Sequence, residues 1–372
     1  MFSAISSLLN KPIARNLTRN ALLAMDPEQA HKASILALKS GLVAKPFANN
    51  SKEAKELNTN IAGIALSNPI GMAAGFDKNA QVYQALSNLG FGFCEVGTIT
   101  PKPQTGNPKP RLFRLMASRG IINRMGFNNQ GHDVVFAALK QRDKQTGAPV
   151  GINIGANKDS EDFVGDYVLG VKRFAPLANY LTINISSPNT PGLRGLQSPQ
   201  MLERLLSETL NERARQADFV PVFLKISPDL TLESMDDITK IIAKTDLDGL
   251  IVSNTTIRRD FVEGQPNFEQ DGGLSGQPIF ELSTIRLAQM RQRVGPDLAI
   301  IGVGGVYSAA SALAKFQAGA NAIQLYSALV FGGMELMEEI KGGLLDYVRD
   351  KNLKNISQLV GSKTDHWAKK QI

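Results

Sequence analysis

The chain has 372 residues, of which 43% are hydrophobic and 20% are charged, and its formal net charge is +7. This composition permits a large buried core and excludes a wholly disordered or fibrous protein. The single cysteine, Cys94, indicates a reducing compartment and excludes a disulfide framework, a four-thiolate zinc site and an iron–sulfur cluster held by this chain alone.

Residues 1–46 are predicted to form a helical extension. Ser3–Asn10 carries its apolar residues on one face, and the same pattern resumes over Ala14–Leu22. A second helix is expected to open at Asp26-Pro27-Glu28, an acidic N-cap followed by proline at the first helical position, and to stop within Gly41–Pro46.

This extension holds six Lys or Arg residues against two acidic residues. Its periodicity favours a helical pair packed on the main domain, and the open alternative is an interfacial pair with an apolar face in lipid and a basic rim toward the headgroups. Lys11, Arg15 and Arg19 interrupt a secretory signal, and no apolar run of the chain reaches the roughly 18 residues of a transmembrane helix. No basic run alternates with aromatic residues, so nucleic acid is not an expected partner.

After residue 60 the chain contains eight short apolar runs, which are typical of strands buried on both faces. They are Pro69–Ala74, Phe91–Val96, Pro149–Ile154, Tyr180–Ile185, Pro221–Ile226, Asp248–Val252, Leu298–Val303 and Asn321–Tyr326. Helical patterns lie between most of them, for example at Ser198–Ala217, Ser234–Thr245, Pro278–Val294 and Ser308–Ala318.

Eight alternating strand–helix units predict an α/β fold of the (β/α)8, or TIM, barrel class, because a doubly wound sheet rarely needs eight parallel strands. We expect the helical extension to cover residues 1–46, the barrel residues 47–345 and a C-terminal tail residues 346–372. Two long connections follow strand ends: Thr98–Val134, which contains a predicted hairpin turning at Ser118-Arg119-Gly120, and Ser186–Gln197. Long loops in a compact domain are usually functional.

Polar residues gather at the predicted carboxyl ends of the strands, where barrel enzymes place their chemistry. They are Ala74-Gly75-Phe76-Asp77-Lys78, Thr98, Asn153, Asn184, Ser186, Ser187, Lys225, Ser253-Asn254-Thr255, Gly302–Gly305, Tyr326 and Ser327. Because amides both donate and accept hydrogen bonds, these groups suit a flat heterocycle with carbonyl and N–H groups.

Two features of these strand ends indicate a bound anion. Gly302–Gly305 precedes a helix and is a candidate phosphate site, with a simple tight turn as the alternative. Lys225 lies in an apolar strand, where an ammonium group needs either a structural carboxylate or a bound anion such as a reduced flavin.

The search for a general base leaves few candidates. His31, His132 and His366 all lie away from strand ends, and Cys94 is expected to be a small core residue. The hydroxyl groups of Ser186–Thr190 are therefore the remaining candidates.

Three segments carry a specific resemblance: Asn184–Arg194, Asn123–Asn128 and Gly273–Gly276. With them the chain resembles the dihydroorotate dehydrogenase family over nearly its whole length. The resemblance implies an FMN-containing barrel that oxidises dihydroorotate to orotate in pyrimidine (UMP) biosynthesis. The N-terminal extension and a serine rather than a cysteine in the catalytic loop resemble the quinone-dependent, membrane-associated class.

The resemblance also implies residue roles. Ser187 is the implied base, Thr190 relays the proton with a bound water, and Phe127 shields the site. The implied substrate site comprises Lys78, Asn123, Arg124, Met125, Gly126, Phe127, Asn184, Asn189, Asn254 and Thr255. The implied FMN site comprises Ala74, Gly75, Phe76, Asp77, Lys78, Thr98, Asn153, Asn184, Lys225, Ser253, Gly276, Gly305, Tyr326 and Ser327.

A membrane quinone is the implied second substrate, reached through residues 1–46, and no metal is expected. The implied location is peripheral, on the cytoplasmic side of the inner membrane, and nothing in the sequence indicates an obligate partner, so we expect a monomer. Three alternatives stay open: a phosphate-binding barrel isomerase, a scaffold that has lost activity, and a cytosolic dehydrogenase that uses fumarate, or NAD through an iron–sulfur partner.

Overall fold

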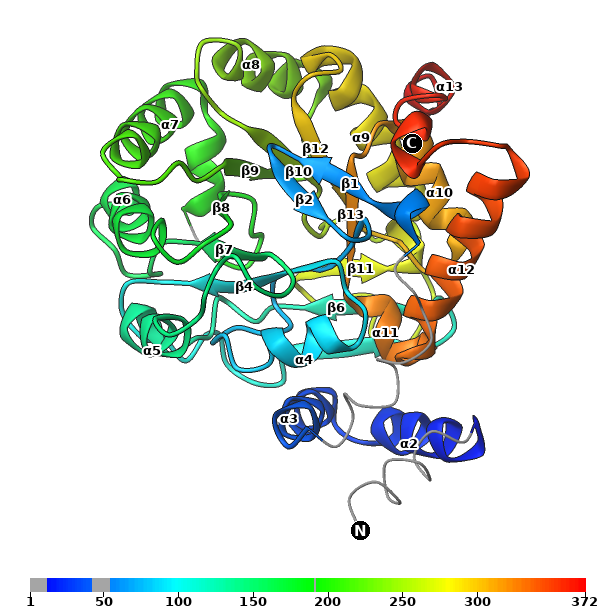
Figure 1. The fold of residues 1–372 in the computed structure, drawn as a ribbon. Coiled ribbons are helices and arrows are strands. Elements are labelled where there is room, and N and C mark those ends of the chain that lie inside the picture. Colours follow the sequence, from blue (N-terminus) through cyan, green and yellow to red (C-terminus); the bar gives the residue numbers. More distant parts are fainter. Residues whose placement is uncertain (1–11, 42–53, 191) are drawn as a thin grey trace.

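A computed structural model describes residues 12–41, 54–190 and 192–372 of the chain. Eight parallel strands close into a barrel, with the predicted (β/α)8 order along the chain (Figure 1). They are β3 (Ile70–Met72), β4 (Phe93–Ile99), β7 (Val150–Ile154), β8 (Tyr180–Asn184), β9 (Val222–Ile226), β10 (Gly249–Val252), β12 (Ala299–Val303) and β13 (Ala322–Leu325). Each strand overlaps one of the eight predicted apolar runs, and only β4 extends beyond its run, which was predicted to end at Val96. The predicted fold class is confirmed.

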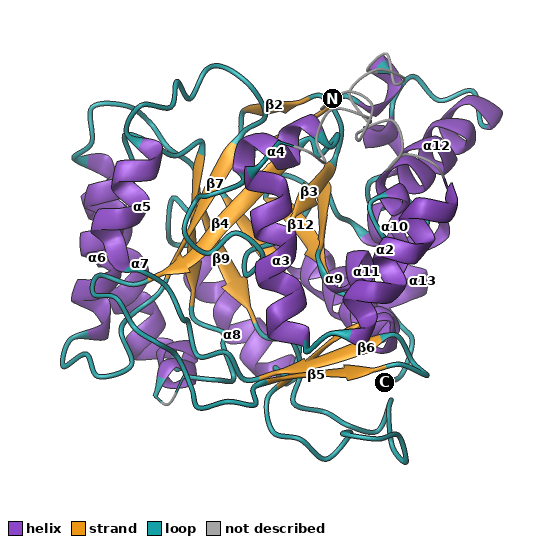
Figure 2. Cartoon of the chain, turned by 90° about the horizontal axis from the view of Figure 1, so that it is seen from below, coloured by secondary structure: helices purple, strands orange, loops and turns teal. Residues whose placement is uncertain are grey.

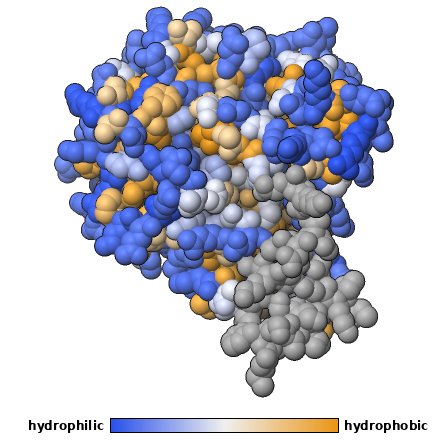
Figure 3. All heavy atoms as spheres, viewed as in Figure 1, coloured by the Kyte–Doolittle hydropathy of each residue, from blue (hydrophilic) through white to orange (hydrophobic). Residues whose placement is uncertain are grey.

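Helices surround the barrel (Figure 1). They are α4 (Tyr83–Asn88), α5 (Gly131–Leu139), α6 (Phe163–Phe174), α7 (Pro199–Ala214), α8 (Leu232–Ile242), α9 (Phe280–Val294), α10 (Ala309–Ala318), α11 (Ser327–Gly332) and α12 (Glu335–Asp350). In α8, Met235, Ile238 and Ile242 are buried at helical spacing, which is the apolar stripe that holds such a helix on a sheet. The four helices named from the sequence correspond to α7, α8, α9 and α10. Figure 3 shows mostly hydrophilic side chains on this face, with hydrophobic ones scattered among them.

Aromatic side chains fill the amino-terminal end of the barrel. Phe93, Tyr180 and Phe223 form one buried cluster with residues of a small antiparallel hairpin, β1 (Thr59–Ile61) and β2 (Ile64–Leu66), which covers that end. Gly151 of β7 faces the Tyr180 ring, and a β-carbon there would overlap the ring. Large rings on one strand thus depend on glycine on the neighbouring strand.

A second sheet lies at the opposite end of the barrel. The predicted hairpin forms β5 (Leu112–Leu115) and β6 (Gly120–Asn123), and β11 (Gly273–Gly276) pairs with β6 to complete a three-stranded antiparallel sheet. The hairpin is confirmed, but its turn spans residues 116–119, and Gly120, which was predicted in the turn, begins β6. The pairing with β11, which is 150 residues away at Asn123–Gly273, was not predicted.

The N-terminal helices α2 (Pro12–Ala24) and α3 (Pro27–Lys39) lie side by side next to the barrel (Figures 1 and 2). The α3 helix packs on β5 and α4, and α2 packs on α11. The side chain of Asp26 accepts the backbone N–H groups of Glu28 and Gln29, as expected of the predicted N-cap. The helix predicted at 3–10 lies outside the described residues. Of the helices that are described, none is both long and apolar enough to cross a bilayer.

The C-terminal segment packs on the barrel helices. The boundary expected between residues 345 and 346 falls inside α12, and α13 (Thr364–Ala368) contacts α9 and α10. Trp367 of α13 is buried, and its ring meets the edge of Phe280 with centroids 5.8 Å apart.

Candidate active site

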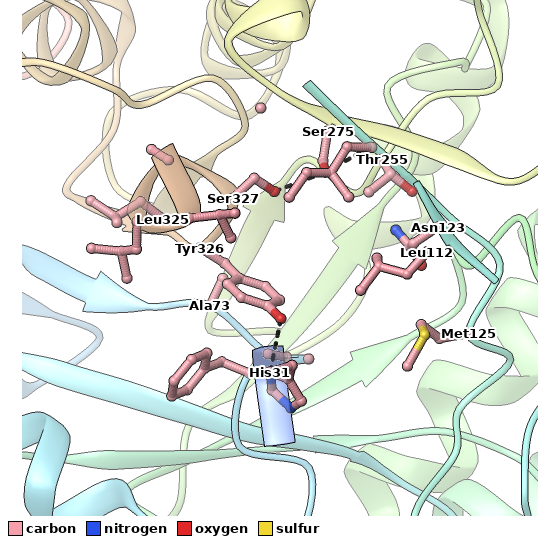
Figure 4. A pocket seen from close by; sticks show the side chains of 18 of the residues that line it. His31, Ala73, Leu112, Asn123, Met125, Thr255, Ser275, Leu325, Tyr326 and Ser327 are labelled. Carbon is pink, nitrogen blue, oxygen red and sulfur yellow. Dashed lines mark hydrogen bonds between the residues drawn. The ribbon is translucent and has the colours of Figure 1, made fainter. Parts of the chain in front are cut away.

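A cavity of about 440 Å³ extends from the carboxyl ends of the barrel strands to helices α2 and α3. Its walls come from the strand ends, the β5–β6–β11 sheet and both N-terminal helices. In Figure 4, Tyr326 and His31 point toward each other at one side, and Asn123 and Met125 lie on the other. One cavity therefore joins the polar barrel mouth to the helical extension.

Most of the residues predicted for the site line this cavity. They are Ala74, Gly75, Phe76, Lys78, Thr98, Asn123, Met125, Gly126, Phe127, Asn184, Ser187, Asn189, Lys225, Ser253, Asn254, Thr255, Gly276, Gly305, Tyr326 and Ser327. Residues from seven of the eight predicted strand ends thus meet at one site, because the carboxyl ends of parallel barrel strands share one rim.

Four predicted residues, Thr190, Arg124, Asp77 and Asn153, do not line the cavity, and three of them are bonded to protein groups instead. The carboxylate of Asp77 accepts the backbone N–H groups of Gln81 and Val82, both at 2.8 Å. The guanidinium of Arg124 lies over the Phe113 ring and donates to Gln270. Asn153 is fully buried one hydrogen bond behind the wall.

Buried amides form a continuous network at the barrel mouth. Asn153 Oδ1 accepts the Thr98 hydroxyl at 2.5 Å and Asn184 Nδ2 at 3.1 Å. Asn184 Oδ1 in turn accepts Ser186 Oγ at 3.2 Å and Asn254 Nδ2 at 3.3 Å. Asn184 and Asn254 line the cavity, so this network presents fixed donors and acceptors to a bound heterocycle.

The Ser186–Gln197 loop brings Ser187 to the cavity. Ser187 is buried, and its Oγ accepts the backbone N–H of Asn189 at 3.2 Å. Asn189 Nδ2 donates to Asn123 Oδ1 at 3.3 Å, which ties the loop to the end of β6. Thr190 Oγ1 is buried and has no hydrogen-bond partner among the described residues. Phe127, which packs against Gly155, closes another part of the wall.

Lys78 supplies a positive charge at the mouth. Its Nζ donates to the carbonyl of Gly75 at 2.7 Å. Burial, assisted by the charge of Arg111 and opposed by Glu28 and Asp77, lowers the pKa of Lys78 to about 8. Lys78 is therefore largely a cation at neutral pH and suits a carboxylate ligand.

Lys225 is a second buried ammonium group, and it has no hydrogen-bond or ion-pair partner among the described residues. Burial lowers the pKa of Lys225, and the charge of Glu95 opposes that effect. Gln324, which also lines the cavity, has a buried Oε1 without a partner in the described chain. An unpaired cation and an unpaired acceptor lining one cavity indicate a polar, anionic ligand there, the second of the two alternatives considered from the sequence.

The glycine segment after β12 forms a tight backbone cradle. Gly304 and Gly305 both have positive φ, and a β-carbon on Gly305 would overlap the backbone of Phe280. Ser327, whose Oγ lies 2.8 Å from Ser275 Oγ, stands on the same wall (Figure 4). Exposed backbone and hydroxyl groups of this kind suit a phosphate. FMN, with its phosphate and its anionic reduced ring, thus fits the residues present.

Sequence reasoning missed His31 and Arg114. The Nδ1 of His31 lies 3.2 Å from the hydroxyl of Tyr326 (Figure 4), and its ring meets the edge of Phe76. Burial, assisted by Lys78, lowers the pKa of His31 to about 3, so the ring is neutral. Arg114 of β5 donates to the carbonyls of Leu22, Leu23 and Met25 at the end of α2. A signal for His31 existed, because it lies one helical turn after Glu28, so the two polar side chains share a face of the predicted helix.

Two other groups singled out from the sequence, Cys94 and His132, lie in the core, and His366 is exposed. Cys94 is buried, as predicted, and burial raises the pKa of its thiol. His132 is buried against the edge of Phe174, and burial lowers its pKa to about 4. Within residues 12–41, 54–190 and 192–372, no cluster of His, Cys, Asp and Glu side chains has the arrangement of a metal site.

Comparisons with known proteins agree on one family. Residues 56–348 match the family described as dihydroorotate dehydrogenase. The dihydroorotate dehydrogenase (quinone) of Brucella anthropi is 51% identical over 360 residues, covering 96% of this chain and 98% of the relative. That of Rhizobium johnstonii is 52% identical over 362 residues, covering 96% and 99%.

Solved structures are similar as well. The crystal structure of DHODH from Eimeria tenella in complex with ferulenol superposes with a TM-score of 0.86 at 37% identity, covering 94% of this chain and 98% of that one. The ligand-free structure of the same enzyme gives a TM-score of 0.87 at 38% identity, covering 91% and 99%.

Proposed function

Because this chain belongs to the dihydroorotate dehydrogenase family and is an enzyme of its quinone-dependent type, we propose that Ser187 is the base that takes a proton from dihydroorotate. Ser187 lines the cavity from within the loop that follows β8. When bound, FMN would supply the hydride acceptor for dihydroorotate oxidation and the redox link to the quinone. The overall product is orotate, in de novo UMP biosynthesis.

A serine hydroxyl is a weak base at neutral pH and needs help from its surroundings. The N–H of Asn189 donates to Ser187 Oγ and favours negative charge on that oxygen. Thr190, three residues later, has a buried hydroxyl with no partner in the described chain, which leaves it able to pass the proton onward through a water. Phe127 keeps bulk water from this part of the wall.

The substrate ring is held by amides and the Lys78 cation. Lys78 neutralises the carboxylate, and Asn123, Asn189, Asn184, Asn254 and Thr255 bond the ring carbonyls and N–H groups. Met125 and Gly126 line the same wall. Arg124 acts from behind it, by fixing the end of β6 against the β11 segment through Gln270.

The cofactor is held at both of its ends. Lys225 and the amide network would hold the ring end, since the unpaired Lys225 ammonium needs an anion. Gly276, Gly305, Tyr326 and Ser327 would hold the phosphate, and Ala74, Gly75, Phe76, Thr98 and Ser253 complete the wall. Asp77 shapes the Gly75–Lys78 turn, and Asn153 supports Asn184 from behind.

The quinone enters from the N-terminal helices. The observation that carries this proposal is the single cavity, which runs from Ser187 to Leu22 of α2 and Ala30 of α3. At its helical end, apolar side chains such as Leu22, Leu23 and Leu38 lie beside polar groups that include His31, Tyr326 and Arg114. This mixture suits a quinone head with an apolar tail.

We place the enzyme at the cytoplasmic side of the inner membrane as a peripheral monomer. The exposed Leu17 of α2 and Leu36 of α3, and the basic surplus of residues 1–46, suit an apolar face in lipid with cationic residues at the headgroups. Flotation with anionic vesicles and sedimentation of the purified protein test the membrane and monomer assignments.

The deciding experiment is steady-state turnover of dihydroorotate with quinone, fumarate or NAD as acceptor. Quinone is expected to support turnover far better than the other two. Deletion of residues 1–46 should abolish quinone-dependent turnover; undiminished turnover by that variant would contradict the proposed quinone entrance.

A further inference from the structure

Glu95 of β4 is a fully buried carboxylate inside the barrel, just below the cavity. Three donors from three other strands converge on it. Asn153 Nδ2 of β7 donates to Oε1 at 2.7 Å, and Tyr180 Oη of β8 and Gln324 Nε2 of β13 donate to Oε2 at 3.1 and 2.9 Å. Glu95 itself does not line the cavity, so the proposed chemistry does not use it directly.

The direction of these bonds determines how the amides above are turned. An ionised carboxylate only accepts hydrogen bonds, so Asn153 must direct its NH2 group downward to Glu95. Its oxygen then faces upward, where it accepts Thr98 Oγ1 and Asn184 Nδ2. Asn184 consequently turns its own oxygen toward Ser186 and Asn254 Nδ2.

We propose that Glu95 is a positioning residue that fixes, through Asn153, which end of the Asn184 and Asn254 amides faces the bound pyrimidine. The inference rests on the substrate role proposed above for Asn184 and Asn254. An amide has nearly the same shape when flipped, so packing alone does not select its orientation. Glu95, a buried acceptor at the base of this series of hydrogen bonds, does select the orientation. It thereby sets which amide atoms donate and which accept at the cavity.

The test is Glu95→Gln, which keeps the shape of the side chain but replaces one acceptor oxygen with a donor. One of the three groups that donate to Glu95 then faces the new NH2 group. A flip of the Asn153 amide relieves that conflict, but it reverses donors and acceptors in the hydrogen bonds that lead from Asn153 to Asn184 and Asn254. The matched control is Thr182→Val, which removes a buried barrel hydroxyl that has no hydrogen-bond partner in the described chain.

Three quantities are measured for each protein: the orotate Kd of the FMN-loaded enzyme by calorimetry, the FMN Kd of the apoprotein, and Tm. Glu95→Gln is expected to weaken orotate binding about tenfold, the effect of roughly one misdirected hydrogen bond. Thr182→Val is expected to bind orotate as the wild type does.

A compensating exchange separates orientation from general damage. A double variant combines Glu95→Gln with Asn153→Asp. The amide introduced at position 95 donates to the carboxylate introduced at position 153, and the other oxygen of that carboxylate again accepts hydrogen bonds from Thr98 and Asn184. The net charge is unchanged. This double variant is expected to recover orotate binding to within about threefold of the wild type.

The outcomes are distinct. The positioning role is overturned if Glu95→Gln binds orotate as tightly as the Thr182→Val control does. It is also overturned if the double variant binds orotate no more tightly than Glu95→Gln does. Failure of the wild type itself to bind orotate overturns the proposed substrate site, and this inference with it.

Discussion

Glu28 of α3 and Arg111, which precedes β5, form a buried ion pair across 83 residues of sequence, with Nη2 and Nε of Arg111 at 2.9 and 3.2 Å from the carboxylate oxygens. Arg111 Nη1 also donates to the carbonyl of Asn107 at 2.9 Å, and Asn107 Nδ2 donates to the carbonyl of Asn189 at 3.1 Å. The helix at the proposed quinone entrance is thus bonded, through two residues, to the loop that carries Ser187.

Breaking this pair should affect both stability and quinone turnover. Arg111→Met is expected to lower the free energy of unfolding by about 3 kcal/mol, because it leaves the buried Glu28 carboxylate with only the exposed Lys109 ammonium, at 3.4 Å, as an ionic partner. It should also lower kcat/KM for quinone by loosening α3. Arg213→Met, which breaks a similarly buried pair with Asp248 far from the cavity, is the control. Urea unfolding and steady-state kinetics measure both effects; equal kinetic losses in the two variants would remove the specific role of Arg111.

Replacement of the proposed base should separate catalysis from cofactor binding. Ser187→Ala is expected to lower orotate formation by about a thousandfold, the range that loss of a general base produces. Bound FMN, measured by its absorbance, should stay at the wild-type level because Ser187 belongs to the substrate loop. Near-normal turnover would reject Ser187 as the base.

The unpaired Lys225 should matter chiefly for flavin retention. Lys225→Met is expected to raise the FMN Kd of the apoprotein at least about tenfold, since a charged hydrogen bond in a buried site is lost. Lys341→Met, at a largely buried lysine of α12 outside the cavity wall, is the control and should leave FMN binding unchanged. Equal FMN affinity in both variants would contradict the assignment.

Orotate affinity should depend on pH through Lys78. Its pKa of about 8 means that the ammonium group is present below that pH and is lost above it. The orotate Kd is therefore expected to be level near pH 7 and to rise by up to about tenfold per pH unit above 8. Arg remains charged throughout this range, so Lys78→Arg should lose the pH dependence even if its affinity is lower. A wild-type Kd that is constant from about pH 7 to 9 would exclude Lys78 as the carboxylate partner.

Buried neutral His31 should make the fold sensitive to acid. Its pKa is about 3 in the folded protein and 6.5 ordinarily, so between these values only the unfolded chain takes up the proton. The free energy of unfolding should consequently fall as pH is lowered through 6.5, and His31→Asn should reduce that fall. Urea unfolding at about pH 7.5 and 5 measures it, with the exposed His366→Asn as control. If the free energy of unfolding falls equally with pH in the two variants, His31 does not contribute to the acid sensitivity.

The sequence by itself determined the features that depend on near neighbours. The eight apolar runs, the Asp26 N-cap and the hairpin of β5 and β6 follow from periodicity and local hydrogen bonding, which act over a few residues. The gathering of strand-end residues at one mouth followed as well, because a parallel barrel has a single carboxyl-end rim.

Only the tertiary structure decided which polar groups meet across long separations. The contact between His31 and Tyr326 spans 295 residues, and the pairing of β6 with β11 spans 150 at Asn123–Gly273. Closure of the barrel decides which buried groups line the cavity and which support it from behind. Lys225 lines it, and Asn153 and Glu95 lie behind it. The physical reason is that burying a polar group costs free energy unless it has hydrogen-bond or ionic partners, and those partners come from strands that are distant in the sequence.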